Sequence, residues 1–335
     1  MTALGNAFDE TPVNIYKYHS TDNLAEILRF VEGKSFDVVH VDHLHMAYYG
    51  LAVGKVLGIP VALREHNLEL KIMKRFAETA GNPLHRVYAA VQVSKFKRYE
   101  PKICATVDKC IMITEEDKKA LLSYRKDVDA VVIPAGVDTE YFSFVGGGGE
   151  ENAIAYVGSL DWLPNIDGLK WFVREVMPRI VSANPGAKFY IYGKNPLPAV
   201  RKLDDGKNVI VKGFVDDVRE VYRKARVLVV PLLAGSGMRI KILEAMAAGK
   251  AIVTTRIGSE GITCESGKNI LVADRPTEFA EDVLRLLNNG LIRETIGREA
   301  STFATREYSW DSIGLRFWDA YVSLIEDHRK KRNQS

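Results

Sequence analysis

Residues 226–255 read RVLVVPLLAGSGMRIKILEAMAAGKAIVTT. Two mostly apolar, β-branched runs, RVLVVP (226–231) and KAIVTT (250–255), enclose a glycine turn and an apolar helical segment. Strands this apolar are typical of sheets buried on both faces, and a strand–helix–strand order is typical of parallel pairing. The stretch therefore predicts one βαβ unit of a parallel sheet.

The same alternation extends over most of the chain. Short apolar runs recur between helical segments, at residues 12–19, 36–41, 59–65, 109–114, 130–134, 153–158, 188–193, 208–214 and 269–273. The glycine- and acid-rich stretch at 135–152 has no periodicity, so we expect a linker there. The predicted fold class is α/β, with two doubly wound Rossmann-like domains facing a cleft. The predicted N-terminal domain is 1–134 and the C-terminal domain 153–306, and a helix at 307–330 is expected to pack back toward the first domain.

Composition narrows the class of protein. A chain of 335 residues has room for two domains, and its net charge of +3 does not indicate nucleic acid. The three cysteines have no zinc-like spacing, and no apolar run approaches the ~18–20 residues that cross a bilayer. The first residues, MTALGNAFDETPV, do not read as a signal peptide. We expect a cytoplasmic protein that binds no nucleic acid.

The turn AGSG (234–237) follows the carboxyl end of a predicted strand, where open α/β sheets bind ligands. Its glycines would let the backbone approach a ligand, and its serine is expected to cap the next helix and leave N–H groups free for an anion. Two cations follow, as a diphosphate would require. The predicted diphosphate-binding residues are Gly235, Ser236, Gly237, Arg239 and Lys241.

Glu244 lies farther along the same helix, among apolar neighbours. A partly buried carboxylate can accept hydrogen bonds from two adjacent hydroxyls, as on a ribose. A surface pair between Lys241 and Glu244, next to an ordinary turn, explains the same residues without a ligand. The residues alone leave both interpretations open.

The stretch GSGMRIKILEAMAAGKAIVTTRIGSEGI (235–262) resembles the signature of the group 1 glycosyltransferases, a retaining family with the GT-B fold. Further motifs follow in the family's order: FDVVHVDH, PAGVDTEYF, YVGSLDWLPNIDG, VKGFVDDVREVY and YSWDSI. The resemblance implies a metal-independent enzyme without a cofactor. It would move a sugar from a nucleoside-diphosphate sugar to a hydroxyl of a saccharide or lipid-linked acceptor.

The resemblance also assigns roles, with two departures. The second of the family's paired glutamates falls on Glu244, which implies contact with the ribose, but the first falls on Ser236. The family often holds the diphosphate with an Arg and a Lys after its first C-domain strand, and residues 158–165, GSLDWLPN, contain neither. We infer that Arg239 and Lys241 supply this charge instead, as in a subset of the family with the pattern G-x-G-x-R-x-K.

By the same resemblance, His66 in LREHNLE corresponds to the family's histidine that contacts the donor sugar and phosphate, and we predict it as the catalytic residue. Asp216 and Asp217 read as helix caps rather than metal ligands. Five further residues are expected near the nucleotide or the sugar: Gly158, Gly213, Phe214, Ser259 and Glu260. Ser259 and Glu260 begin a turn, which explains them equally well.

The run HVDHLH (40–45) could be a metal cluster. However, His40 and Asp42 alternate with Val41 as strand residues do, and the next loop can line an acceptor pocket. We therefore predict no metal.

The start of the chain differs from the family. Members open with a strand, a glycine loop, a helix and a second strand, whereas this sequence opens at about the third strand, PVNIYKYH (12–19). The N-terminal domain is therefore expected to be incomplete. This departure, together with Ser236, keeps open a non-catalytic or truncated GT-B nucleotide-binding protein; a GT-B sugar-nucleotide epimerase ranks lower.

Residues 71–102 are basic, with eight Lys or Arg against two Glu. Aromatic residues interleave with these charges, at Phe76, Tyr88, Phe96 and Tyr99. A solvated helical face explains the pattern, but a basic amphipathic surface also suits an acidic membrane. We therefore include peripheral contact with the inner face of a membrane among the expectations.

Overall fold

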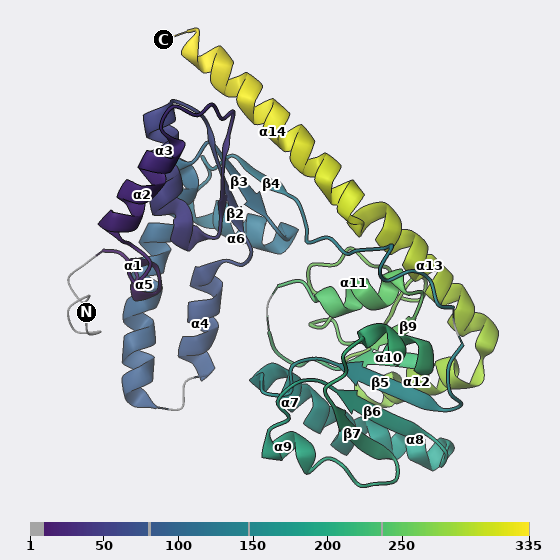
Figure 1. Ribbon diagram of the computed structural model, residues 1–335. Helices are drawn as coiled ribbons and strands as arrows, with labels where there is room; N and C mark the ends of the chain where they lie inside the picture. Colours follow the sequence, from purple (N-terminus) through teal and green to yellow (C-terminus); the bar gives the residue numbers. More distant parts are fainter. Residues whose placement is uncertain (1–9, 80–81, 147, 236, 335) are drawn as a thin grey trace. The chain divides into compact units, whose positions relative to one another are not determined.

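The structure is a computed structural model that describes residues 10–79, 82–146, 148–235 and 237–334. The chain divides into two compact units (Figure 1). Unit 1 comprises residues 1–134 and 314–335, and unit 2 comprises residues 135–313. The predicted linker at 135–152 thus belongs to unit 2.

Unit 1 contains a four-stranded parallel sheet with strand order β1-β2-β3-β4. Its strands are β1 (Val39–Asp42), β2 (Val61–Glu65), β3 (Lys109–Met112) and β4 (Ala130–Val132). Its helices are α1 (Val13–Tyr16), α2 (Thr21–Val31), α3 (Ala47–Leu57), α4 (Glu69–Thr79), α5 (Pro83–Thr106) and α6 (Glu115–Tyr124), with a 3-10 turn at Leu44–Met46. In the described part of unit 1 the strands follow chain order, so the expected reversal of a doubly wound sheet occurs in unit 2 alone.

The strand expected at residues 12–19 is wrong, because Val13–Tyr16 form the short helix α1. Pro12 precedes this helix, and its restricted φ suits a helix start. Ile15 is buried in the core, and the Val13 N–H donates to Oε1 of Gln92 at 3.0 Å. Tertiary contacts with α5 therefore select a helix from an ambiguous apolar pattern.

Helix α14 (Trp310–Arg332) carries the C-terminal residues of unit 1, from Gly314 on. Tyr321 hydrogen-bonds Nδ1 of His40 on β1 at 2.8 Å, and His328 hydrogen-bonds the Gly58 carbonyl at 3.2 Å. The guanidinium of Arg64 on β2 lies 4.7 Å from the centroid of the Phe317 ring. These contacts join α14 to the sheet of unit 1. No helix in the described ranges has an apolar stretch of the length that a bilayer requires.

Unit 2 contains a six-stranded parallel sheet with strand order β10-β9-β8-β5-β6-β7. Its strands are β5 (Ala153–Val157), β6 (Lys188–Tyr192), β7 (Val209–Gly213), β8 (Val227–Val230), β9 (Ala251–Thr254) and β10 (Leu271–Val272). Its helices are α7 (Leu163–Trp171), α8 (Met177–Ala183), α9 (Pro198–Arg201), α10 (Val218–Lys224), α11 (Ile240–Ala247), α12 (Pro276–Asn288) and α13 (Gly290–Tyr308), with a π-helical turn at Phe172–Val176. The order reverses between β5 and β8, which makes this sheet doubly wound.

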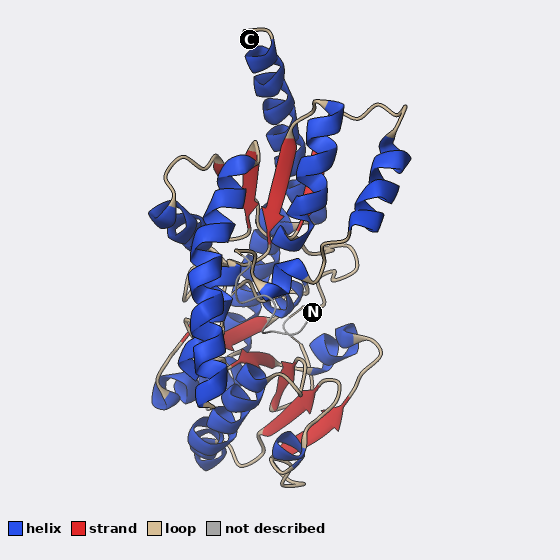
Figure 2. Ribbon diagram, turned by 90° about the vertical axis from the view of Figure 1, so that its left-hand side faces the viewer, coloured by secondary structure: helices blue, strands red, loops and turns tan. Residues whose placement is uncertain are grey.

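Alternate residues of each central strand of unit 2 enter two separate cores. On β8, Val227 and Val229 pack with α7, α8 and α12, whereas Leu228 and Val230 pack with α10, α11 and α13. Helices therefore cover both faces of the sheet (Figure 2). The helix α10 is capped by Asp217, which accepts the Arg219 N–H at 2.9 Å, as the sequence predicts.

The strands β5 and β6 are each followed by a glycine, Gly158 and Gly193, and these two residues lie close together. A Cβ on Gly193 would collide with the carbonyl oxygen of Gly158 and would lie 2.8 Å from Cγ of Leu160. The Gly193 N–H also donates to the Gly213 carbonyl at 2.7 Å. The absence of a side chain at Gly193 thus lets the loops after β5 and β6 approach each other.

We expect Gly193→Ala to lower the free energy of unfolding by about 3 kcal/mol, because the added methyl group must displace backbone. Gly213→Ala is the matched control, since Gly213 has a φ of +75° but open space around its Cβ. Left-handed backbone alone should cost the control about 1 kcal/mol. Urea unfolding of both variants measures the difference, and equal losses would contradict the role given to close contact.

Candidate functional site

The carboxyl ends of β5 and β8 lie where the strand order of unit 2 reverses. Open α/β sheets bind ligands at this point, because the two connections leave it in opposite directions. The loop after β5 begins at Gly158, and the loop after β8 leads to Arg239 and α11. Residues from these two loops form the candidate site.

Lys241, on the first turn of α11, reaches the loop after β5. Its Nζ lies 3.1 Å from the hydroxyl of Tyr156 and 4.5 Å from the centroid of that ring. A Cβ on Gly158 would collide with this same nitrogen. Burial and the charge of Arg239 lower the pKa of Lys241 to about 7. The ammonium is therefore enclosed at the switch point and titrates near neutral pH.

Arg239 immediately precedes α11 and is only 7% exposed. Its guanidinium packs on the loop, since a Cβ on Gly235 would collide with Nη2, and it lies 5.7 Å from the centroid of the Trp162 ring. Arg239 and Lys241 thus place two cations at the start of one helix.

The expectation that Ser236 caps this helix is wrong, because α11 begins at Ile240 and Arg239 occupies the N-cap position. Gly235 and Gly237 have φ angles of 132° and 79°, which keep the preceding chain out of helical conformation. Ser236 itself lies outside the described residues.

Glu244 is half-buried on α11, and its Oε2 accepts a hydrogen bond from the hydroxyl of Tyr222 on α10 at 3.1 Å. Burial raises the pKa of Glu244. The simple Lys241–Glu244 surface pair is absent from the described contacts, in which each side chain bonds a buried tyrosine instead. The carboxylate is therefore held in place by its own partner.

A pocket of about 250 Å³ opens beside Gly158, at the ends of β5, β6 and β7. Phe214 is 56% exposed at this pocket, and Nζ of Lys194 lies 4.8 Å from the centroid of its ring. The volume is below the ~300 Å³ of the smallest whole-ligand sites, so it suits part of a ligand. The lining residues are Val157, Gly158, Ser159, Gly193, Lys194, Phe214, Val215 and Val218.

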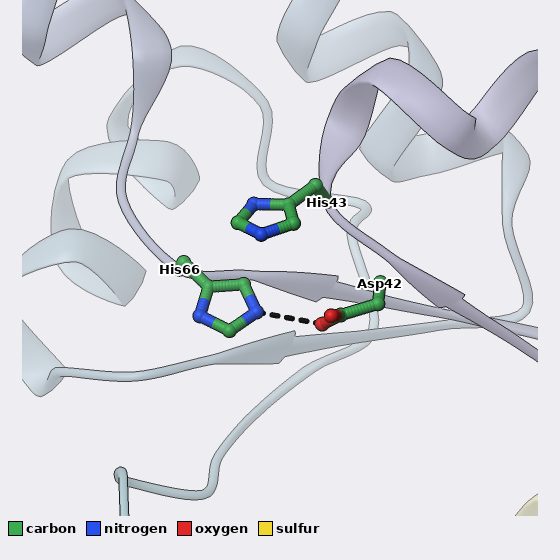
Figure 3. A group of neighbouring side chains, drawn as sticks. All are labelled: Asp42, His43 and His66. Atoms are coloured by element: carbon green, nitrogen blue, oxygen red, sulfur yellow. Dashed lines mark hydrogen bonds and ion pairs between the residues drawn. The ribbon is translucent and has the colours of Figure 1, made fainter.

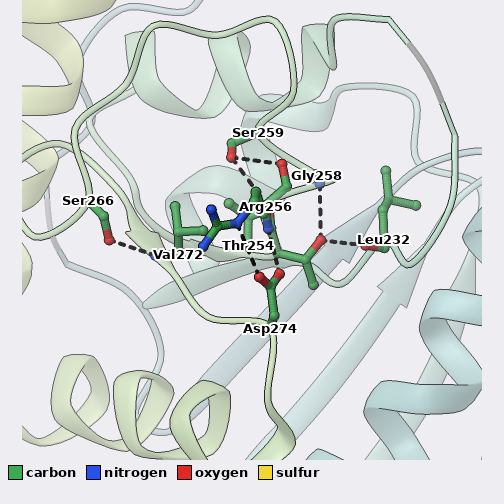
Figure 4. A network of polar contacts seen from close by, with 9 residues as sticks. Leu232, Thr254, Arg256, Gly258, Ser259, Ser266, Val272 and Asp274 are labelled. Atoms are coloured by element: carbon green, nitrogen blue, oxygen red, sulfur yellow. Dashed lines mark hydrogen bonds and ion pairs between the residues drawn. The ribbon is translucent and has the colours of Figure 1, made fainter.

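Ser259 and Glu260 lie in the loop after β9, where Ser259 takes part in a local network (Figure 4). The Ser259 hydroxyl donates to the carbonyl of Arg256 at 3.2 Å, and the Gly258 N–H donates to the hydroxyl of Thr255 at 3.0 Å. The Thr255 hydroxyl in turn donates to the Leu232 carbonyl, which joins this loop to the loop after β8. These bonds fit a structural turn, and neither residue lines the pocket beside Gly158.

His66 lies in unit 1, directly after β2. Its Nε2 is 2.6 Å from Oδ1 of Asp42 at the end of β1, and its ring stacks on His43 with centroids 4.0 Å apart (Figure 3). Burial raises the pKa of Asp42, but the hydrogen bond and charge of His66 outweigh this and lower it overall. Burial and the nearby His66 lower the pKa of His43.

The backbone of His43 has a φ of 78° and a ψ of 143°, a region that glycine normally occupies. A side chain held there costs of order 1–3 kcal/mol, which neighbouring structure must offset. The strained residue carries its ring over His66. Strain of this kind is concentrated at functional sites.

The structure brings together some of the predicted residues and adds others. Lys241 meets Gly158, Arg239 meets Gly235, and Phe214 joins Gly158 at the pocket. Four partner residues were not predicted from the sequence: Tyr156, Tyr222, Gly193 and Lys194. Gly193 and Lys194 directly follow the strand KFYIY, a position that could have been read as site-forming. The sequence around Tyr156 and Tyr222 is that of ordinary core aromatic residues, so it did not indicate a role in the site.

Residues 9–141 match the family model described as Glycosyltransferase Family 4, and residues 151–289 match the one described as Glycosyl transferases group 1. An uncharacterized 44.6 kDa protein from the cps region of Klebsiella pneumoniae is 24% identical over 255 residues, which cover 73% of this chain and 64% of that protein. An uncharacterized glycosyltransferase of Methanocaldococcus jannaschii is 25% identical over 302 residues, covering 88% and 78%.

Solved structures show the fold. The crystal structure of TarM superposes with a TM-score of 0.68 at 17% identity and covers 89% of this chain, which spans 58% of TarM. The Anabaena protein HepE, solved in complex with UDP, superposes with a TM-score of 0.67 at 14% identity, covering 90% of this chain and 82% of HepE. With both units matched in chain order, the protein belongs to the group 1 glycosyltransferases and has their GT-B fold.

Proposed function

We propose that this protein is a retaining glycosyltransferase that moves a sugar from a nucleoside-diphosphate sugar to a hydroxyl of a saccharide or lipid-linked acceptor. The observation that carries the proposal is the position of Lys241 at the switch point, against Gly158 and Tyr156. An enclosed cation beside two glycine-containing loops suits a diphosphate. Arg239 and Glu244 lie on the same helix or at its start.

In this assignment Arg239, Lys241 and the Gly235–Gly237 turn hold the diphosphate. Glu244, oriented by Tyr222, accepts hydrogen bonds from the ribose hydroxyls. The base occupies the pocket beside Gly158 and Phe214, which is large enough for part of the nucleotide. HepE was solved with UDP, so a uridine nucleotide is the first donor class to test.

The chemistry follows from electrostatics. The bond between the anomeric carbon and the phosphate oxygen breaks while the acceptor oxygen bonds to the same face of that carbon. The acceptor's proton passes to the leaving phosphate, whose developing charge is stabilised by Arg239 and Lys241. His66 would orient the sugar and the leaving group. In this proposal Arg239 and Lys241 stabilise the negative charge of the diphosphate, so the transfer requires neither a metal nor a cofactor.

A second candidate is a non-catalytic protein that binds the nucleotide alone. The observation that favours it is Ser236, which stands where the family has its first glutamate. Both candidates require the donor site of unit 2, but only the glycosyltransferase moves a sugar to an acceptor. Nucleotide binding without release of nucleoside diphosphate from any donor sugar, in the presence of acceptors, would select this candidate.

We expect UDP at about 100 times its dissociation constant to stabilise the fold by about 2.7 kcal/mol, seen as a higher melting temperature. Glu244→Ala should abolish this shift, because the ribose loses its acceptor. Glu281→Ala, an exposed glutamate of α12, is the control and should keep the shift. Guanosine and adenosine diphosphates are measured in parallel, and no shift with any nucleotide would refute the donor site.

We expect the affinity for UDP to fall as pH rises above about 7, by up to tenfold per pH unit. The pKa of Lys241 is about 7, so the ammonium is lost above this pH, whereas the terminal phosphate of UDP is already ionised there. Calorimetric titration from pH 6.5 to 9 measures the slope. Lys241→Met should bind more weakly and without this slope, while Lys268→Met, an exposed lysine, should match the natural protein. A slope retained in Lys241→Met would assign the titration to another group.

We propose that unit 1 contacts the inner face of a membrane through α4 and α5. These two helices lie side by side (Figure 1). Leu84, Val87 and Val91 follow one another at helical spacing on α5 and are exposed. Lys97, Arg98 and Lys102 are exposed farther along the helix. Phe96 differs from the expectation, because it is fully buried in the core and cannot contribute. A cytoplasmic location with this peripheral contact suits a lipid-linked acceptor.

We expect the protein to sediment with vesicles that contain phosphatidylglycerol, and salt to weaken this binding. The double variant Leu84→Glu, Val87→Glu should lower the partition coefficient by about tenfold or more, because it removes apolar contact and adds negative charge. Leu291→Glu on α13 is the control, since Leu291 and Leu84 are both 77% exposed. Equal binding of the control and the double variant would contradict the assignment of this surface.

A further inference from the structure

Three metal-ligating side chains meet in unit 1. One oxygen of Asp42 and one nitrogen each of His43 and His66 lie within 4.8 Å of one another. Figure 3 shows the two imidazole rings one above the other, with the carboxylate facing His66. We propose that Asp42, His43 and His66 form a binding site for one transition-metal ion of the Zn²⁺ class.

The parallel sheet creates this juxtaposition. Asp42 on β1 pairs in register with Arg64 on β2, so both strands end at the same edge of the sheet. His43 follows Asp42 directly, and His66 follows the last residue of β2 directly. Two ligands therefore come from one strand end and the third from its neighbour. Asp42 and His43 are adjacent in the run HVDHLH, but His66 lies 23 residues beyond His43, so the sequence pattern alone does not join it to them.

The ligand set decides the class of metal. Two imidazole nitrogens and one carboxylate oxygen suit Zn²⁺, Cu²⁺, Ni²⁺ or Fe²⁺, whereas Mg²⁺ and Ca²⁺ prefer oxygen alone. Tetrahedral Zn²⁺ with bonds of about 2.0–2.2 Å separates its ligand atoms by roughly 3.4 Å. The Asp42–His66 contact of 2.6 Å must open slightly, and His43 must approach. The two rings stack with an interplanar angle of 24°, so one ring must also turn for both nitrogens to point at the ion. Asp42 and His43 are exposed and His66 is partly exposed, which leaves these side chains room to move.

The other polar groups nearby have contacts elsewhere. His40 hydrogen-bonds Tyr321, and the guanidinium of Arg64 lies on Phe317, both on α14. His45 contacts the ring of Tyr18, with centroids 5.0 Å apart. The protein then supplies three ligands and leaves a position for water or another ligand, which is the pattern of open zinc sites.

Metal binding would change the state of His66. The nitrogen that now bonds Asp42 carries no proton once it binds the ion, so a proton that stays on the ring must be on Nδ1. If His66 acts in transfer, as the proposed function holds, the loaded protein should be inhibited. Nucleotide binding by unit 2 uses none of these three residues and should be unchanged.

The test is a titration of the purified, metal-stripped full-length protein with ZnCl₂ by calorimetry, without any nucleotide. One equivalent should bind. Asp42→Asn, His43→Asn and His66→Ala should each weaken binding by at least about tenfold, since even changes in outer-shell partners cost 10–100-fold. Asparagine is chosen at position 43 because it is polar and closer to histidine in size than alanine is, but it has no imidazole nitrogen. His85→Ala, an exposed histidine of α5, should bind as the natural protein does.

Replacement by Co²⁺ gives an independent readout, because visible absorption bands of a nitrogen- and oxygen-bound ion should appear and should be lost in the Asp42 and His43 variants. Circular dichroism and thermal unfolding without metal verify that each variant is folded. No saturable Zn²⁺ binding, or equal binding by the three variants and His85→Ala, would overturn the metal site. A UDP shift without Zn²⁺ binding would refute this inference alone, and Zn²⁺ binding without a UDP shift would refute the proposed function alone.

Discussion

The six-stranded sheet of unit 2 is buried on both faces, and this constraint shapes the rest of the unit. Val227 and Val229 enter one core and Leu228 and Val230 enter the other, so helices must cover both sides. A chain that covers both faces has to reverse its direction of winding, and here it does so between β5 and β8. The loops after these strands leave in opposite directions, and the candidate donor site occupies the space between them.

Glycine adapts this edge of the sheet for ligands. Gly193 permits contact between the loops after β5 and β6, and Gly158 leaves room for the ammonium of Lys241. The same enclosure lowers the pKa of Lys241 to about 7. A buried cation destabilises the empty site and interacts more strongly with an anion that replaces its lost water. The packing that shapes the sheet edge thus also sets the electrostatics of the site.

Unit 1 places its polar groups by the same parallel geometry. The edge formed by β1 and β2 carries Asp42, His43 and His66, and the strained backbone of His43 brings its ring over His66. Behind this edge, the buried carboxylate of Glu100 accepts the N–H groups of Glu69 and Leu70 at 2.7 and 3.0 Å, which anchors the start of α4. Burial raises the pKa of Glu100 to about 8, despite these two hydrogen bonds.

The residue pattern was sufficient for the α/β class and for ten of the strands, because apolar periodicity and turn residues are local properties. It failed at residues 12–19, where contacts with α5 favour a helix, and at the start of α11, which begins at Ile240 with Arg239 as its N-cap residue. Contacts between distant residues required the folded chain. Lys241 meets Tyr156 and Gly158, and Asp42 meets His66, because parallel strands gather their carboxyl ends at one edge. Glu244 meets Tyr222 because α10 and α11 pack in the same core on one face of the sheet, and no local pattern records either pairing.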